Sequence, residues 1–338
     1  MMNKLEGAVV VLTGASSGIG RVTARMFARR QAKLVLAARS PEALQEVARR
    51  CIELGGETIA VPTDVRDESQ VLALRDAAIA RFGRIDIWVN DAASYLLGNL
   101  EEVPSELVRG LMETNVLGTF HGAKAAVTQF RKQGHGTLIS IGSIAGTAPY
   151  AKASAYCASK HAVHAMNAAL RQELVGTNIE ACIVAPASID TPLFDHAANY
   201  TGVEMRVMPP IYSPGRVARA ILRCAERPRR LVFVGGAPLL TTLLHLLLPR
   251  VYERLQPQLV AERHVGPRTA PKIPGNIPET LPPYDDEAGW RRGRASVLEP
   301  PPPEEATLVA RARRRRRVAL RLARRQSEAA IGFRSRPL

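Results

Sequence analysis

Short apolar runs rich in β-branched residues alternate with longer helical patterns between residues 8 and 234. Most of these runs lack polar alternation, as expected for parallel strands that are covered on both faces. The seven runs are Ala8–Leu12, Leu34–Ala38, Thr58–Val61, Ile85–Val89, Thr137–Ile141, Ile179–Val184 and Leu231–Val234. Ser40-Pro41 and Ser213-Pro214 are typical helix starts, a capping serine before a first-turn proline. The pattern predicts an α/β fold, a doubly wound (Rossmann) sheet of about seven parallel strands with helices on both faces.

The chain changes character after Val234, where residues 236–256 are strongly apolar. Their uncharged core, Gly235–Pro249, is 15 residues long, shorter than the roughly 20 that span a bilayer. We expect a C-terminal apolar helix with two open interpretations. It packs on the domain or in a subunit interface, or it lies in a membrane surface with Arg250 and Arg254 at the headgroups. The lack of a strongly polar face favours packing.

Residues 257–338 are predicted to be a Pro-rich linker and an Arg-rich tail, mostly disordered. Eleven prolines fall between Pro257 and Pro303, and nine arginines fall in Arg311–Arg325. The tail's charge suits nucleic acid or anionic lipid, or simply solvent. Because neither interleaved aromatic residues nor a nucleic-acid-binding motif accompanies it, no specific nucleic-acid partner is predicted. The predicted organisation is a catalytic domain (1–235), an apolar helix (236–256) and this tail (257–338).

Composition fits a folded, soluble protein: 46% of the 338 residues are hydrophobic and 23% are charged, which excludes collagen-like and wholly disordered chains. The net charge is +15, and residues 252–338 carry about half of it. Four scattered cysteines without zinc-ligand spacing favour a reducing compartment and predict no metal site. The N-terminus does not resemble a signal peptide. We expect a cytoplasmic protein, membrane-associated if the apolar helix lies in a bilayer surface.

A glycine-rich turn follows the first apolar run and opens a helix. It reads Thr13-Gly14-Ala15-Ser16-Ser17-Gly18-Ile19-Gly20. In this place Gly14 permits a tight turn, Gly18 lets the backbone approach a pyrophosphate, and Gly20 allows close helix–strand packing. Free N–H groups at the helix start would face the anion. The motif predicts dinucleotide binding through Gly14, Ser16, Ser17, Gly18, Ile19 and Gly20.

The second apolar run ends at Arg39. NAD-binding chains usually place an acidic residue there for the ribose 2′-hydroxyl, whereas a guanidinium pairs with a 2′-phosphate. Arg39 therefore favours NADP(H) over NAD(H).

Three further residues suggest proton chemistry. Tyr156 and Lys160 lie four positions apart in a predicted helix over residues 154–176, so their side chains share a face. Ser143 lies just past the carboxyl end of the Thr137–Ile141 run, at the edge where parallel sheets bind ligands.

Together with Asn115, these motifs resemble the classical short-chain dehydrogenase/reductase family over about residues 5–235. The resemblance implies a nicotinamide cofactor, a homodimer or homotetramer, and a catalytic tetrad of Asn115, Ser143, Tyr156 and Lys160. It also implies that Asp64 contacts adenine and that the segment 186–191 holds the nicotinamide end. The cofactor-binding residues that it adds are Asp64, Val65, Asn90, Tyr156, Lys160, Pro186, Ile189 and Thr191.

Two positions depart from the family pattern. Asn90-Asp91-Ala92-Ala93 stands where the family has Asn-Asn-Ala-Gly, and Pro186-Ala187 replaces Pro-Gly. These changes add a charge and β-carbons beside the cofactor site, so they bear on cofactor affinity. They remove no proton-transfer group.

The expected chemistry is hydride transfer between the nicotinamide and a carbonyl or secondary alcohol. Tyr156 would donate the proton, with its pKa brought down by Lys160, and Ser143 would stabilise the oxyanion. The family implies that Asn115 holds a water near Lys160. An apolar segment at 187–212 would close over the substrate, which favours an apolar one. The alternative is a catalytically weak cofactor-binding sensor or scaffold whose basic tail mediates membrane or nucleic-acid attachment.

Overall fold

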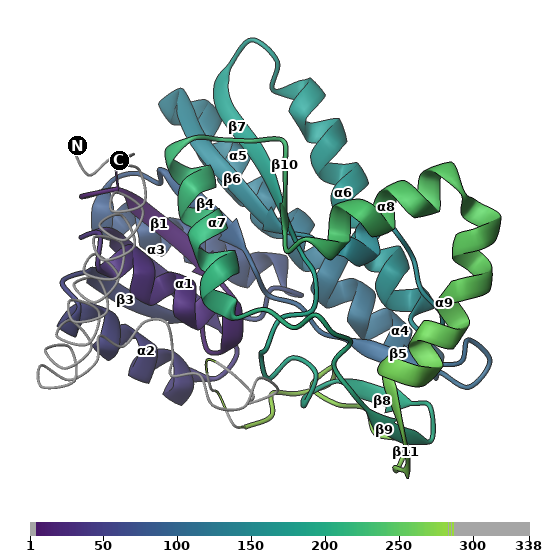
Figure 1. Ribbon diagram of the computed structural model, residues 1–338. Helices are drawn as coiled ribbons and strands as arrows, with labels where there is room; N and C mark the ends of the chain where they lie inside the picture. Colours follow the sequence, from purple (N-terminus) through teal and green to yellow (C-terminus); the bar gives the residue numbers. More distant parts are fainter. Residues whose placement is uncertain (1–4, 283, 285, 287–338) are drawn as a thin grey trace, which may run out of the picture. The chain divides into compact units, whose positions relative to one another are not determined.

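The computed structural model describes residues 5–282, 284 and 286. Its main feature is a seven-stranded parallel sheet in the order β10-β7-β6-β4-β1-β2-β3, shown in Figure 1. The strands are β1 (Val9–Thr13), β2 (Lys33–Ala38), β3 (Glu57–Pro62), β4 (Ile87–Asn90), β6 (His135–Ile141), β7 (Asn178–Pro186) and β10 (Leu231–Val234). Each contains most of one predicted run, so the predicted fold class is confirmed.

Helices cover both faces of the sheet, and a separate core fills the space on each side. The helices are α1 (Gly18–Ala28), α2 (Pro41–Glu53), α3 (Glu68–Phe82), α4 (Ser105–Met112), α5 (Gly118–Gln133), α6 (Ser154–Glu173) and α7 (Pro214–Glu226). Side chains of α1, α2 and α7 pack in one core, and those of α3, α5 and the end of α6 pack in the other. This is the two-sided burial that the continuous apolar runs predicted.

The strand order reverses at β1, which pairs with β2 on one side and β4 on the other. In this register Val11 lies opposite both Val35 and Trp88. Chain crossovers leave in opposite directions from this point, so a crevice opens beyond the carboxyl ends of β1 and β4. The glycine turn follows β1, and Asp91 follows β4.

Two small sheets lie beyond that edge. Strand β5 (Leu96–Gly98) pairs with β8 (Ala198–Tyr200), and β9 (Val203–Met205) pairs antiparallel with β11 (Val265–Thr269). The second pairing ties the segment after residue 257 to the segment before α7. The expectation of an extended linker from Pro257 is therefore wrong for residues 257–269, because Pro257 lies inside a helix and β11 has a partner strand.

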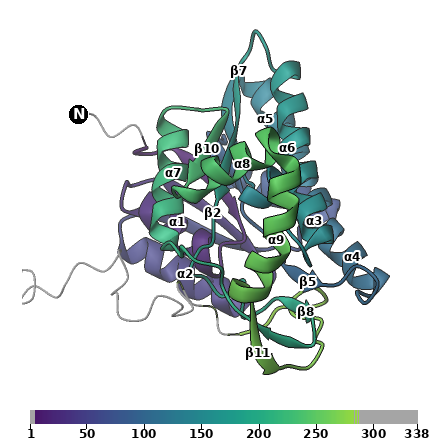
Figure 2. The ribbon, with the colours of Figure 1, turned by 45° about the vertical axis from the view of Figure 1, so that its right-hand side comes forward.

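The apolar stretch after β10 forms two helices, α8 (Ala237–Leu247) and α9 (Pro249–Arg263). Pro249 occupies the first turn of α9, where a proline starts a new helix. Figure 2 shows both helices at the front of the view, beside α6. Their large aliphatic side chains are mostly exposed, so packing of that face on the chain's own domain is wrong, whereas its packing in a subunit interface stays a prediction. Within the described part of the chain, every helix falls short of the length and hydrophobicity needed to cross a bilayer. The Arg-rich tail lies outside the described residues.

The buried strand β2 should determine stability far more than an exposed leucine does. Leu36 is fully buried, whereas Leu100 is 77% exposed. We expect Leu36→Ala to lower the free energy of unfolding by about 2–5 kcal/mol and Leu100→Ala by less than about 0.5 kcal/mol. Urea unfolding of the two variants measures the difference. Similar losses in both would contradict the assigned core.

Candidate active site

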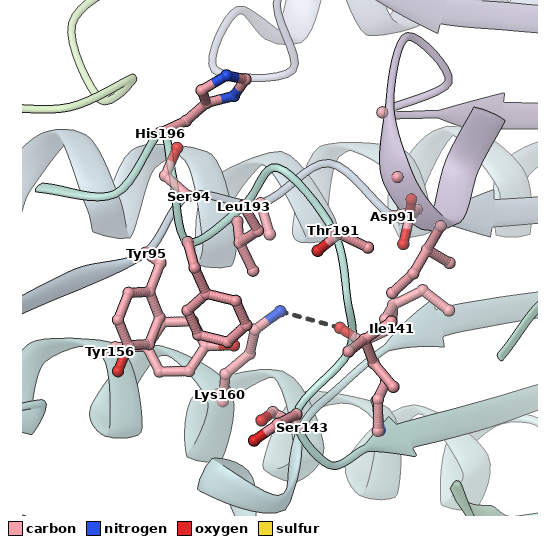
Figure 3. Close-up of a pocket in the computed structure, with 18 of the residues that line it drawn as sticks. Asp91, Ser94, Tyr95, Ile141, Ser143, Tyr156, Lys160, Thr191, Leu193 and His196 are labelled. Carbon is pink, nitrogen blue, oxygen red and sulfur yellow. Dashed lines mark hydrogen bonds between the residues drawn. The ribbon is translucent and has the colours of Figure 1, made fainter. Parts of the chain in front are cut away.

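A cavity of about 390 Å³ runs along the carboxyl edge of the sheet. It extends from the glycine turn to α9, and Figure 3 shows its central part. Fourteen of the predicted site residues line it. They are Gly14, Ser16, Ser17, Gly18, Ile19, Arg39, Asp64, Val65, Ser143, Tyr156, Lys160, Pro186, Ile189 and Thr191. The other three predicted site residues, Gly20, Asn90 and Asn115, are not among the residues that line the cavity. They would influence the site through neighbouring residues.

The glycine turn has the shape of an anion cradle. Gly14 and Gly18 have φ of +71° and +52°, and a Cβ at Gly14 would lie 2.7 Å from the backbone nitrogen of Ala92. The N-cap Ser17 makes no side-chain capping hydrogen bond, and the first turn of α1 carries no acidic residue. The N–H groups of Gly18 and Ile19, at the start of α1, are therefore left to an anion, and the helix dipole favours its negative charge. This geometry fits a dinucleotide pyrophosphate.

Arg39 lies at the adenosine end of the same cavity, beside a second arginine. Its Nη2 donates to the carbonyl of Asn276 at 2.9 Å, while its buried Nη1 has no partner among the described residues. Burial lowers the pKa of Arg39, and the nearby Arg66 guanidinium lowers it further. A phosphate would satisfy the unpaired donor and relieve this repulsion.

Asp64 is held in place by Arg66, which the sequence analysis did not single out. The Arg66 Nε donates to both Asp64 carboxylate oxygens, at 3.0 and 2.9 Å. Burial of Asp64 opposes its ionisation, but these hydrogen bonds prevail and hold its pKa below the usual value. The carboxylate is therefore fixed and charged at the cavity wall.

Lys160 is a buried ammonium held by strand β6. Its Nζ donates to the carbonyl of Ile141 at 3.0 Å, as the dashed line in Figure 3 shows. Burial lowers its pKa to about 8, and the carboxyl of Asp91 opposes that shift. The same Nζ lies 5.8 Å from the centre of the Tyr156 ring.

Tyr156 does not have the lowered pKa that the sequence analysis expected. Burial raises the pKa of its phenol, and a hydrogen bond with Ser143 opposes the shift without overcoming it. Lys160 gives its hydrogen bond to Ile141 instead, so burial dominates. The phenol is a proton donor at neutral pH, next to the Ser143 hydroxyl.

His164 and Asn115 support this cluster from behind. The Ser143 N–H donates to His164 Nε2 at 3.5 Å, and burial lowers the pKa of this histidine to about 4, so it is a neutral acceptor. Asn115 lies in a π-helical turn, Glu113–Leu117. Its side chain bonds the backbone of Ser94, at 2.8 and 3.0 Å, and the hydroxyl of Ser159 at 3.0 Å.

Asn90 and Asp91 have different roles in the departing motif. The Asn90 side chain accepts from the Trp88 indole and donates to the Thr119 carbonyl, so it braces β4 against α5. The Asp91 carboxyl accepts from the N–H of Gly20, and burial raises its pKa well above the usual value. The changed residue thus lies directly behind the glycine turn. Ala93 and Ala187 both line the cavity, where their β-carbons were expected.

The end of the cavity near α9 has an apolar wall, and this wall includes a row of hydrogen-bonded polar side chains. The apolar residues expected in the lid segment are Leu193, Phe194, Tyr200, Val203, Met205, Val207, Met208, Ile211 and Tyr212. Of this set, Leu193, Phe194 and Met208 line the cavity. The remaining members of that set pack elsewhere, several of them in β8 and β9.

Tyr150, Tyr95 and His264 form this row. His264 Nδ1 lies 2.6 Å from the carbonyl of Arg206, so Nδ1 carries the proton and donates. Its Nε2 must then accept from the Tyr95 hydroxyl at 2.6 Å. The Tyr150 hydroxyl, 3.1 Å from that of Tyr95, donates to it in turn. These three side chains therefore present hydrogen-bond acceptors to the cavity, the lone pairs of the tyrosine oxygens, rather than a free O–H group.

A C-terminal strap, residues 270–282 with Tyr284 and Asp286, borders the adenosine end. The carbonyls of Asn276 and Ile277 accept from Arg39 and Arg66, at 2.9 and 3.4 Å, and Asp286 pairs with Arg21 at 3.1 Å. The sequence analysis missed the strap because its prolines suggested disorder. The few apolar residues of the strap, such as the buried Ile277, are the sequence signal that could have indicated a folded segment.

Comparison with known proteins identifies oxidoreductases as relatives of this chain. The family model "short chain dehydrogenase" matches residues 8–200. The uncharacterized oxidoreductase YxnA of Bacillus subtilis is 38% identical over 278 residues, which cover 79% of this chain and 78% of the relative. The ketoacyl reductase HetN of Nostoc sp. is 32% identical over 253 residues, covering 73% and 85%.

A crystal structure of a short chain dehydrogenase/reductase from Burkholderia phymatum in complex with NAD has the same fold. Its TM-score is 0.67 at 26% sequence identity, and the match covers 74% of this chain and 96% of that one.

The position of Asp91 predicts pH-dependent dinucleotide binding. As the pH rises, loss of its proton would place a negative charge behind the pyrophosphate cradle. We expect NADPH affinity to fall roughly tenfold as the pH rises through the raised pKa of Asp91, and to fall less in the Asp91→Asn variant. Fluorescence titration with NADPH measures both. Lys160 titrates in both proteins, and the Asp91 carboxyl also raises the pKa of Lys160. A difference between the two profiles therefore reports the carboxyl acting directly or through Lys160, and identical profiles would contradict the assignment.

Proposed function

The chain belongs to the short-chain dehydrogenases, and on this basis we propose that it is an NADP-dependent oxidoreductase that interconverts a carbonyl group and a secondary alcohol. The observation that carries the proposal is the meeting of Tyr156, Ser143 and Lys160 with the glycine turn in one cavity. We assign the catalytic role to these three residues and a positioning role to Asn115. The dinucleotide would be held by the cavity-lining residues predicted from the sequence, with Gly20 and Asn90 behind them.

The reaction follows from the protonation states of the site. When bound, the nicotinamide supplies or accepts the hydride. Tyr156 gives its proton to the carbonyl oxygen, because its raised pKa keeps the phenol protonated. Ser143 donates to the same oxygen as charge develops there. The Lys160 ammonium, buried beside the Tyr156 ring, stabilises the phenolate that remains.

The preference for NADP rests on Arg39. Its buried, unpaired Nη1 and the adjacent Arg66 form a pair of positive charges suited to a 2′-phosphate. An acidic residue, which would suit the 2′-hydroxyl of NAD, is missing from position 39.

The substrate should be largely apolar. Leu193, Phe194, Met208 and Leu259 line the far end of the cavity, and the Tyr150–Tyr95–His264 chain offers hydrogen-bond acceptors there. An apolar carbonyl compound with one donor group fits this lining.

Further elements of the proposal concern assembly and location. We propose a homodimer or homotetramer in the cytoplasm, with residues 1–235 as its catalytic part. The alternative, a sensor or scaffold without turnover, gains no support from the site, which keeps the proton-transfer side chains. The tail on which that alternative relies lies outside the described residues.

Removing the phenol hydroxyl tests the mechanism. Tyr156→Phe should lower kcat by at least about a thousandfold and leave NADPH affinity within about twofold, because the ring remains. A spectrophotometric screen of apolar ketones with NADPH provides the substrate. Tyr200→Phe, outside the cavity, is the matched control. Near-normal turnover by Tyr156→Phe would exclude this residue as the proton donor.

A charge reversal tests cofactor choice without a substrate. Arg39→Asp should weaken NADPH binding by about a hundredfold, since it exchanges attraction for repulsion at the 2′-phosphate, and should spare NADH. Fluorescence titration with both dinucleotides gives the ratio of affinities. Arg49→Asp, at an exposed site on α2, controls for the loss of net charge. An unchanged ratio would remove Arg39 from the cofactor site.

A further inference from the structure

Helix α8 has its polar and apolar faces reversed relative to an ordinary surface helix. Five leucines, Leu239, Leu240, Leu243, Leu246 and Leu247, are between 43% and 73% exposed. At 100° per residue they fall within an arc of about 120° on one side of the helix. A surface helix normally buries such a stripe.

The polar residues of α8 face the protein instead. The Thr242 hydroxyl lies 2.8 Å from that of Thr147, Thr241 lines the cavity, and the His245 ring packs against Tyr252 at 4.9 Å. Tyr252 is itself buried and donates to the carbonyl of Pro149 at 2.8 Å. These contacts fix the orientation of α8, so its leucines cannot turn inward without breaking them.

The apolar surface continues into α9. Leu248, Val251 and Leu255 are 55%, 45% and 43% exposed. We call these three side chains and the five leucines of α8 the outer face. An exposed aliphatic surface of this extent is unfavourable in water and marks a site of contact.

We propose that the outer face docks the protein on the surface of a phospholipid membrane, with α8 lying in the plane of the lipid. The chemistry of the face favours lipid over a second copy of the chain. All eight of its side chains are aliphatic, whereas the centres of protein interfaces are enriched in aromatic residues, Met and Arg. Hydrocarbon accepts aliphatic side chains without any pairing of polar groups.

Charge and length agree with this occupant. Arg250 and Arg254 are exposed on α9 beside the outer face, in reach of anionic headgroups, with Glu253 as the acid between them. Helix α8 has 11 residues, about 16 Å at 1.5 Å per residue. It is too short to cross a bilayer but long enough to lie in its surface.

The inner sides of α8 and α9 line the cavity, which relates membrane docking to the entry of substrate. Thr241, Tyr252, Gln256 and Leu259 line the cavity, so the inner sides of α8 and α9 face the site while their exposed aliphatic side chains form the outer face. Docking would bring the cavity next to the lipid, from which an apolar substrate could enter. This last step rests on the proposed function; the docking itself does not.

Vesicle flotation of the full chain tests the proposal. The vesicles are phosphatidylcholine with a minor fraction of phosphatidylglycerol, in about 0.15 M and about 0.5 M NaCl, because high salt screens binding by the basic tail. The test variant combines Leu240→Glu, Leu243→Glu and Leu247→Glu. The matched control combines Ile52→Glu, Leu100→Glu and Val175→Glu, at positions that are 56%, 77% and 80% exposed.

We expect the wild-type chain and the control to float with vesicles at both salt concentrations, and the test variant to bind at least about tenfold less. Both variants should keep the circular dichroism spectrum and the urea unfolding midpoint of the wild type, which verifies their folding without relying on the proposed function. Equal binding by the test variant, no vesicle binding by the wild type, or binding lost entirely at high salt would each overturn the proposal. So would a wild-type dimer that ignores vesicles and becomes monomeric in the test variant, since a second copy would then be the occupant.

Discussion

The hydrogen bond from Lys160 Nζ to the carbonyl of Ile141 joins the two halves of the site. It ties α6, which carries Tyr156, to the end of β6, which leads to Ser143. A buried ammonium is costly unless it is paired, and here the edge of the sheet supplies a fixed carbonyl. The bond thereby fixes the distance between the helix and the serine turn. The proposed proton donor and oxyanion donor, Tyr156 and Ser143, come from separate elements, and their register depends on this contact.

The same cavity balances several other buried charges. Asp91 lies behind the glycine turn and interacts with Lys160, while Arg39 and Arg66 repel each other at the adenosine end. Carbonyls of the C-terminal strap meet both arginines. The Asp64 carboxylate balances the charge of Arg66, whereas the strap gives Arg39 a neutral carbonyl and leaves its charge to attract a phosphate. Of the two acidic side chains of the strap, Glu279 and Asp286, Asp286 pairs with Arg21 instead.

The sequence predicted the sheet well because its central strands are buried on both faces. A run such as Leu34–Ala38 is apolar throughout, and only a covered parallel strand suits it. The predicted site residues also fall mostly in one cavity, because glycine turn, Ser143 and Arg39 all follow strand ends. The features that the sequence could not show depend on contacts between residues that lie far apart in the chain. The pKa of Tyr156 follows from burial, His264 reaches Tyr95 across 169 positions, and β11 forms only because β9 lies beside it. Pro257 was interpreted as a helix breaker, yet it lies within α9.

The orientation of α8 was another matter that composition left open. Its sequence favoured a packed helix over a membrane-surface helix, and only tertiary contacts distinguish the two. Thr242 and His245 provide them by bonding and packing toward the domain, which leaves the leucines outside. A helix that merely completed a core would show the opposite arrangement. Thr241 of α8 and Tyr252 of α9 both line the cavity. The two helices that carry the exposed outer face therefore also form part of the cavity wall.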